Sequence, residues 1–214
     1  MTSFPIDRTK ILDALKYPDG IVDVVIDTDT YNEVDDQFAI AWALGSPERL
    51  NVQAVYAAPF CSRAIQTMLS IPEAALRQFA HYADTPAEGM EKSYQEILNL
   101  FSLMGENPEG RVFRGSDRYI GEDGQPVESE AARDLVRRAM ARREGDRLYV
   151  LAIGAITNVA SAILMEPRIM DKITVVWLGG QPPHYNSAIE FNLMQDMTAS
   201  KLLLDCGVPL VLIP

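Results

Sequence analysis

The stretch VIDTDTYNEVDD, residues 25–36, places four aspartates and one glutamate within a dozen positions. A run of β-branched residues leads into it, and a helical pattern follows at once. Carboxylates that converge in a crevice repel one another and lose hydration. Their pKa values rise and the fold is destabilised unless a cation balances the charge. The pattern therefore indicates a divalent cation where the strand meets the helix.

A simpler interpretation is that these acids cap the helix, each contact contributing a few tenths to about 1 kcal/mol. Four aspartates at one strand-to-helix junction are more than capping needs. The ligands on offer are all oxygen atoms, which favour Ca²⁺, Mg²⁺ or Mn²⁺ over Zn²⁺. The stretch is not an EF-hand loop, because the glycine and the final bidentate glutamate of that loop are absent.

The bulk composition narrows the classes of partner. The chain has 214 residues, and its net charge of −11 argues against nucleic acid held through phosphates and against anionic membranes. No apolar run approaches the roughly 20 residues of a membrane span, and the first residues lack a signal-peptide core. The two cysteines, Cys61 and Cys206, form no CxxC motif. We expect a cytoplasmic protein.

Strand-like and helix-like segments alternate along the chain. This order predicts an α/β fold with a mostly parallel open sheet and helices on both faces, in which function gathers at the carboxyl ends of the strands. The expected strands are 21–28, 50–57, 111–115, 147–153, 173–178 and 208–213. The expected helices are 34–44, 61–83, 86–104, 129–143 (with Ser129 as N-cap), 157–165 and 197–205.

Four collinear motifs resemble the inosine-uridine-preferring nucleoside hydrolases. They are the DTD…DD cluster itself, LAIGAITNVASAI (151–163), VVWLGG (175–180) and EFNLMQDMTASKLLLDCGVPLVLIP (190–214). The resemblance implies a Rossmann-like core and a single domain over residues 1–214. It also implies that the C-terminal part of the family domain, with its His-Asp pair, is absent from this chain.

The resemblance further implies a calcium site and a sugar site. The positions that match the family's Ca²⁺ ligands are Asp29, Asp36 and the main-chain carbonyl of Ile153. Those that match its substrate-binding residues are Asp35, Glu190, Asn192 and Asn186. Asp29 also matches the catalytic aspartate that takes a proton from the attacking water, and Asp27 matches a carboxylate behind the ligands.

These matches imply a nucleoside hydrolase that releases base and ribose in a calcium-dependent reaction, assembled as a homodimer or homotetramer. Two features depart from the family. The gap TYNEV between DTD and DD is two residues longer than usual, and Ala58-Pro59 stands where the family has Gly-Asn. We therefore expect the loop from Thr30 to Val34 to bulge at the site, and recognition on the 5′ side of the sugar to differ.

Two other functions fit part of the pattern. A haloacid-dehalogenase-like phosphatase also has a strand that ends in DxD, but it requires Thr where this chain has Tyr31. A non-catalytic nucleoside- or sugar-binding protein would not need the full set of acidic metal ligands.

Of the two histidines, His81 is typical of a surface or packing residue, and His184 lies in a loop expected to border the crevice. Trp42 is expected in the core.

Overall fold

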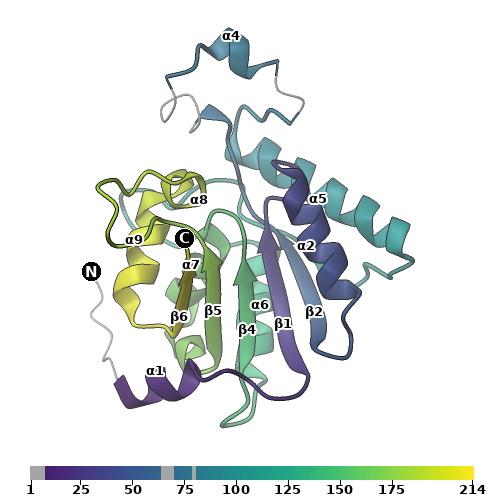
Figure 1. Cartoon of the computed structure of the whole chain (residues 1–214), viewed down its shortest axis with the longest axis vertical. Coiled ribbons are helices and arrows are strands. Elements are labelled where there is room, and N and C mark those ends of the chain that lie inside the picture. The colour runs from purple at the N-terminus through teal and green to yellow at the C-terminus, as the bar shows by residue number, and fades with distance from the viewer. Residues whose placement is uncertain (1–7, 64–69, 79–80) are drawn as a thin grey trace.

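Parallel strands build one sheet at the centre of the molecule (Figure 1). The computed structural model describes residues 8–63, 70–78 and 81–214. Within them the sheet has six strands in the order β3-β2-β1-β4-β5-β6, and every neighbouring pair is parallel. The strands are β1 (Val22–Thr28), β2 (Leu50–Ala57), β3 (Val112–Arg114), β4 (Leu148–Ala152), β5 (Ile173–Leu178) and β6 (Leu210–Ile213).

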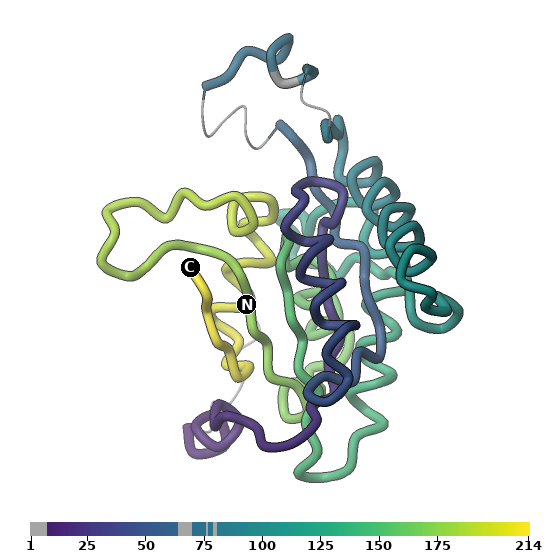
Figure 2. The backbone as a smooth tube through the Cα atoms, turned by 45° about the vertical axis from the view of Figure 1, so that its right-hand side comes forward, coloured from purple at the N-terminus to yellow at the C-terminus, as the bar shows by residue number. Residues whose placement is uncertain are grey.

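Helices cover the two faces of the sheet unequally. On one face lie α6 (Glu130–Met140), α7 (Thr157–Met165) and α9 (Met197–Cys206). On the other face, α2 (Val34–Leu44) and α5 (Pro86–Met104) pack over β1 and β2, as Figures 1 and 2 show from two directions. The remaining described helices are α1 (Arg8–Ala14), α4 (Glu73–Leu76), the 3₁₀ turn η1 (Pro167–Asp171) and α8 (Phe191–Gln195).

β1 is buried on both faces, which is why apolar side chains from Val22 to Ile26 point to both sides of the sheet. Val25 packs with the α6–α7 side of the core, whereas Val24 and Ile26 pack with the α2–α5 side. The chain leaves β1 in one direction to reach β2 and later returns to add β4 on the other side. The carboxyl ends of β1 and β4 therefore flank a topological switch point, where open α/β sheets form their ligand crevices.

Asn158, in the first turn of α7, ties three strand ends together beside this switch point. Its buried side-chain Nδ2 donates to Asp27 Oδ1 at 2.8 Å and to the carbonyl of Ala57 at 3.2 Å. Its Oδ1 accepts from Ser116 N at 2.8 Å and Ser116 Oγ at 2.9 Å. One amide thus links β1, β2 and the turn after β3. Gly115 accommodates it, since a Cβ there would lie 1.9 Å from the Ala57 carbonyl oxygen.

Most expected elements are confirmed, and the helices at 34–44, 86–104 and 157–165 have the expected bounds. The Ser129 cap is also confirmed, because its hydroxyl accepts from Ala132 N at 3.1 Å. The long helix expected over 61–83 is wrong. Among the described residues of that range, Arg63 and the four-residue α4 are helical, residues 70–72 and 81–83 are not, and 64–69 and 79–80 lie outside the described residues. Pro72 accounts for part of the difference, since proline disfavours helix in the residue before it.

The expectation that Trp42 lies in the core is wrong. Its side chain is 80% exposed, in line with exposed Val34 and Phe38 along one face of α2. The face of α2 that turns to the sheet carries Ile40 and Ala43 instead. Helical spacing identifies which residues share a face, but the apolar content of α2 is high on both sides and does not identify the buried one.

We predict that Asn158→Ala lowers the free energy of unfolding by about 3 kcal/mol, because it leaves buried groups of Asp27, Ala57 and Ser116 without partners. Urea unfolding followed by circular dichroism measures the change. The matched control is Asn107→Ala, whose exposed side chain accepts only from Glu109 N and which should cost less than about 1 kcal/mol. Equal costs for the two variants would contradict the linking role of Asn158.

Candidate active site

The acidic cluster lies at the carboxyl end of β1, and two of its carboxyl groups are buried against each other. Asp29 follows β1 directly, and Asp36 occupies the first turn of α2. Each carboxyl group affects the pKa of the other, so the two side chains lie close together. A turn in which Asn32 N donates to the Asp29 carbonyl at 2.7 Å holds the strand end in place.

The environment makes these groups hard to ionise. Burial raises the pKa of Asp29 well above its usual range, and the nearby charge of Asp36 raises it further. Burial also raises the pKa of Asp36 to about 7, against the opposing effect of the hydrogen bond from Asp29. Two like-charged, desolvated carboxylates are costly without a cation or shared proton. The capping interpretation does not account for them, because α2 has no side-chain N-cap hydrogen bond.

Asp27 lies one side-chain layer below, still inside β1. Its Oδ1 accepts from Asn158, but its Oδ2 is buried without a hydrogen-bond partner among the described residues, as is Asp29 Oδ2. Burial raises the pKa of Asp27 to about 7, and the Asn158 hydrogen bond opposes the rise. Asp27 is therefore a buried carboxyl group beneath the strand end, held by Asn158.

The turn after β4 lies against the acidic cluster. Ile153 N donates to the Asp27 carbonyl at 2.8 Å, which continues the β1–β4 pairing. At Gly154, an added Cβ would lie 2.9 Å from Asp29 Oδ1 and 3.0 Å from Asp29 N. The Gly154 carbonyl accepts from Trp177 Nε1 at 3.1 Å. Glycine is required here because the β4 turn lies directly against the Asp29 carboxyl.

Glu190 and Asn192 lie at the same edge of the sheet, after β5. The Asn192 side chain donates from Nδ2 to the Leu178 carbonyl at 3.0 Å and to the Ile153 carbonyl at 3.4 Å. The Glu190 carboxylate caps α8, accepting from Asn192 N and Leu193 N at 2.9 Å each, and it also accepts from Gly180 N at 2.7 Å. Asn192 thus reaches the β4 turn, while Glu190 fastens the double-glycine turn to α8.

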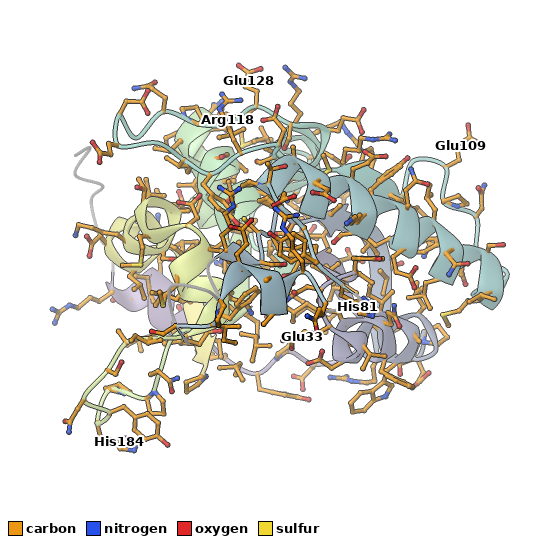
Figure 3. All side chains as sticks on the ribbon, turned by 90° about the horizontal axis from the view of Figure 1, so that it is seen from above. Glu33, His81, Glu109, Arg118, Glu128 and His184 are labelled. Carbon is orange, nitrogen blue, oxygen red and sulfur yellow. The ribbon has the colours of Figure 1, made fainter. Side chains whose placement is uncertain are left out.

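The other expected substrate residues are exposed. Asp35 is exposed in the first turn of α2, and Asn186 is exposed in the loop between β5 and α8. Figure 3, seen from above, shows His184 of the same loop far from Glu33 and His81. His81 is an exposed residue that packs against the acidic loop. Its Nδ1 lies 2.6 Å from the Tyr31 carbonyl oxygen of the acidic loop, and its exposed ring packs on the Tyr31 ring, which confirms the expectation of a surface or packing residue.

Sequence reasoning missed a buried polar group beside this edge. Gln195 Oε1 accepts from Cys61 N at 3.0 Å and from the Tyr119 hydroxyl, and its Nε2 donates to the Cys61 carbonyl at 3.2 Å. Asp196, next to it, caps α9 and accepts from Thr157 Oγ1 at 2.8 Å and Ile120 N at 2.9 Å. No sequence spacing points to the Gln195 contacts, since 134 residues separate it from Cys61.

The residues that could hold a cation are Asp29, Asp36 and the carbonyl of Ile153. The donor set suits a hard cation, because all three donors are oxygen atoms and the buried Asp29 Oδ2 has no partner among the described residues. No group of three or more His, Cys, Asp or Glu side chains in the described ranges is arranged to hold a metal. A cation here would rely on two carboxylates and the main chain.

We predict that replacing Asp27 by Asn changes the pH dependence of stability in the absence of divalent cations. The folded-state pKa of Asp27 is raised from 3.8 to about 7. The folded state therefore holds its proton more tightly than the unfolded state, and the resulting stability is complete below pH 4 and lost as the pH rises through 7. Asp27→Asn removes this loss, so its stability relative to wild type rises over that window by a few kcal/mol, on the order expected for such a shift.

Urea unfolding at pH 4.5, 6 and 8 in EDTA measures the difference. Asp117→Asn, which changes an exposed carboxylate paired with Arg118, serves as the control and should follow wild type. A constant difference between Asp27→Asn and wild type at all three pH values would contradict the assignment.

Known proteins match both the sequence and the fold. The chain is 27% identical over 187 residues to the inosine-uridine preferring nucleoside hydrolase of Crithidia fasciculata, covering 84% of this chain and 56% of that protein. It is 26% identical over 195 residues to the pyrimidine-specific ribonucleoside hydrolase RihB of Escherichia coli, covering 88% of this chain and 58% of that one. The chain therefore spans somewhat more than half the length of these two relatives.

Solved structures share the fold. The purine-preferring ribonucleoside hydrolase from Gardnerella vaginalis matches with a TM-score of 0.61 at 22% identity, over 89% of this chain and 60% of that one. The type III effector XopQ, solved with adenosine diphosphate ribose, matches with a TM-score of 0.53 at 14% identity, over 97% of this chain and 63% of that one. None of the described helices is long and apolar enough to cross a membrane.

The family described as inosine-uridine preferring nucleoside hydrolase matches residues 24–214. This match includes the acidic cluster, the β4 turn and the segment from Glu190 onward, all of which meet at one edge of the sheet. The chain belongs to the inosine-uridine preferring nucleoside hydrolase family.

Proposed function

We propose that this chain carries the catalytic crevice of a calcium-dependent nucleoside hydrolase, which cleaves the N-glycosidic bond of a ribonucleoside to give free base and ribose. The single observation that supports this most strongly is the buried Asp29–Asp36 pair. Asp29 Oδ2 has no partner in the described part of the chain, and its carboxyl lies at the switch point of a sheet shared with nucleoside hydrolases.

Asp29 is the catalytic residue in this proposal. Cleavage of an N-glycosidic bond passes through a sugar with oxocarbenium character, and a water molecule adds to C1′. An ionised Asp29 would accept the proton of that water, while the surrounding carboxylates favour the positive charge that develops on the sugar.

In this proposal, polar side chains around the acidic cluster bind the sugar. Asp35, Glu190, Asn192 and Asn186 are the proposed partners of the ribose hydroxyls. Asn192 is the best placed, because its side chain already reaches the Ile153 carbonyl beside the proposed cation site. Directional hydrogen bonds from such groups orient C1′ toward the attacking water, and orientation contributes to the rate as well as to binding. The Glu190 carboxylate also accepts three backbone N–H groups, so substrate contact would be added to its capping role.

Asp29, Asp36 and the Ile153 carbonyl would hold Ca²⁺. A calcium ion held there would lower the pKa of a water molecule and provide a contact for a sugar diol. The fit is supported by the two carboxyls, which would otherwise have to share a proton, and by the unpartnered Asp29 Oδ2. The same proposal includes a single domain over residues 1–214, a cytoplasmic location and a homodimer or homotetramer.

Turnover of ribonucleosides with and without Ca²⁺ tests the function. We predict that wild type releases ribose only with Ca²⁺ and that Asp29→Asn lowers kcat by at least about 100-fold, because it removes the proton acceptor. The control Asp205→Asn changes an exposed carboxylate of α9 paired with Lys201 and should retain full activity. Ribose release by Asp29→Asn at the wild-type rate would refute the role of Asp29.

The same assay separates the alternatives. Release of phosphate from 4-nitrophenyl phosphate, without release of ribose, would favour a haloacid-dehalogenase-like phosphatase. Thermal stabilisation by Ca²⁺ and nucleoside without any turnover would favour a non-catalytic binding protein. Both outcomes contradict the hydrolase proposal.

Gly154→Ala tests the calcium site independently of turnover. The new Cβ would lie 2.9 Å from Asp29 Oδ1, so the carboxyl must shift, and we expect calcium affinity to fall by about tenfold or more, as for altered metal-site supports. Isothermal titration calorimetry measures the affinity. Gly121→Ala is the matched control, because its Cβ would meet only the exposed Asp123 side chain, at 3.2 Å. Equal calcium affinities in the two variants would contradict the proposed ligand set.

A further inference from the structure

The short helix α8 begins directly after one proposed sugar-binding residue, Glu190, and carries another, Asn192. It has five residues, and a helix of this length has little stability of its own, so contacts with the rest of the fold must hold it in place. Two of these contacts lie on the side of β5. Glu190 accepts from Gly180 N at 2.7 Å, and Asn192 donates to the Leu178 carbonyl at 3.0 Å. Figure 1 shows α8 above the carboxyl end of β5.

Gln195 attaches the other end of α8 to a different part of the fold. Its buried Oε1 accepts from Cys61 N at 3.0 Å, and its Nε2 donates to the Cys61 carbonyl at 3.2 Å. A main-chain N–H can only donate and a carbonyl can only accept, so these two bonds set the orientation of the amide. The Tyr119 hydroxyl donates a third hydrogen bond, to Oε1. We call these three hydrogen bonds the Gln195 clamp.

The segment held by the clamp runs beside the acidic cluster. Ala58 N donates to the Thr28 carbonyl at 2.7 Å, which continues the pairing of β1 with β2 up to the residue before Asp29. Cys61 follows three residues later and is buried. The pKa of the Tyr119 hydroxyl is raised by burial and by the charges of Cys61 and Asp29. The clamp therefore joins α8 to the region of the strand end that carries the proposed catalytic aspartate.

We propose that Gln195 is a positioning residue for the ribose site, an inference that rests on the proposed hydrolase function. Gln195 and Asn192 lie about one helical turn apart on α8, so a rotation of the helix that frees one displaces the other. With the clamp in place, the Asn192 amide stays 3.4 Å from the Ile153 carbonyl, beside the proposed cation site. Without the clamp, α8 loses its attachment to the segment after β2, and Asn192 is no longer held in one orientation toward the sugar.

Gln195→Met tests this role, because it removes the three hydrogen bonds and keeps a side chain of similar length. In the full chain with Ca²⁺, we expect KM for inosine to rise by about tenfold or more and kcat to fall by less than about threefold, because Asn192 contributes binding and is not the proton acceptor. Calcium affinity, measured by isothermal titration calorimetry, should match wild type, because no proposed calcium ligand lies on α8. Tyr119→Phe removes only one of the three hydrogen bonds and should raise KM by less.

A double-mutant cycle tests whether Gln195 acts through Asn192. In an Asn192→Ala background, Gln195→Met should raise KM little further, because the residue that it positions is already gone. Gln125→Met changes an exposed glutamine in the loop before α6 and is the matched control, which should behave as wild type. Equal increases in KM from Gln195→Met in both backgrounds would overturn the positioning role, and so would a wild-type KM.

Amide hydrogen exchange tests the clamp without turnover. In Gln195→Met, peptides that cover α8 should exchange faster than in wild type, while peptides that cover α2 should not change. Unchanged exchange over α8 would overturn the inference by itself. A fall in calcium affinity together with the rise in KM would overturn it as well, since the variant would then have disturbed the whole site.

Two remaining outcomes are distinct from these. Should Gln195→Met fail to fold, Tyr119→Phe carries the same measurements, and a wild-type KM together with unchanged exchange over α8 in that variant would overturn the inference. If wild type releases no ribose from any ribonucleoside while exchange over α8 is faster in Gln195→Met, the proposed function is contradicted, and with it the kinetic role of Gln195.

Discussion

Buried negative charge at the carboxyl end of β1 is the constraint on which the rest of the site depends. Asp27, Asp29 and Asp36 are all buried within one strand and the first turn of the next helix. Two of their oxygen atoms have no hydrogen-bond partner among the described residues. A fold keeps such an arrangement only when something balances it, either shared protons or a cation. The raised pKa values favour protonated carboxyl groups when no cation is bound. In the functional protein, we propose that calcium balances the charge instead.

Residues on the neighbouring elements hydrogen-bond to these aspartates or pack against them. Asn158 satisfies one oxygen of Asp27 and simultaneously joins β1, β2 and the turn after β3. Gly154 allows the β4 turn to lie against Asp29, and Trp177 holds that turn through its indole N–H. These side chains sit on separate elements that a parallel sheet brings to one edge. A rigid edge of this kind positions reacting groups better than a loop alone would.

The acidic loop connects this scaffold to the segment that follows β2. Within TYNEV, Tyr31 contacts both His81 and Lys92. The segment after β2, which begins with Ala58 and Pro59, leads to that histidine and is held by Gln195 through the main chain of Cys61. The acidic loop and the segment after β2 thus meet beside the proposed site.

The sequence by itself determined the local structure and the location of the acidic cluster. The bounds of α2, β2 and α5 follow from apolar periodicity and turn residues, which are local properties. Family motifs also identified the chain's fold and relatives, and the family match confirms them. Only the tertiary structure decided that Trp42 is exposed and that Glu190 caps a helix. It alone brought His81 to Tyr31, 50 residues away. Periodicity reports which residues share a face of one element, whereas contacts between distant residues depend on strand order and on how each connection crosses the sheet.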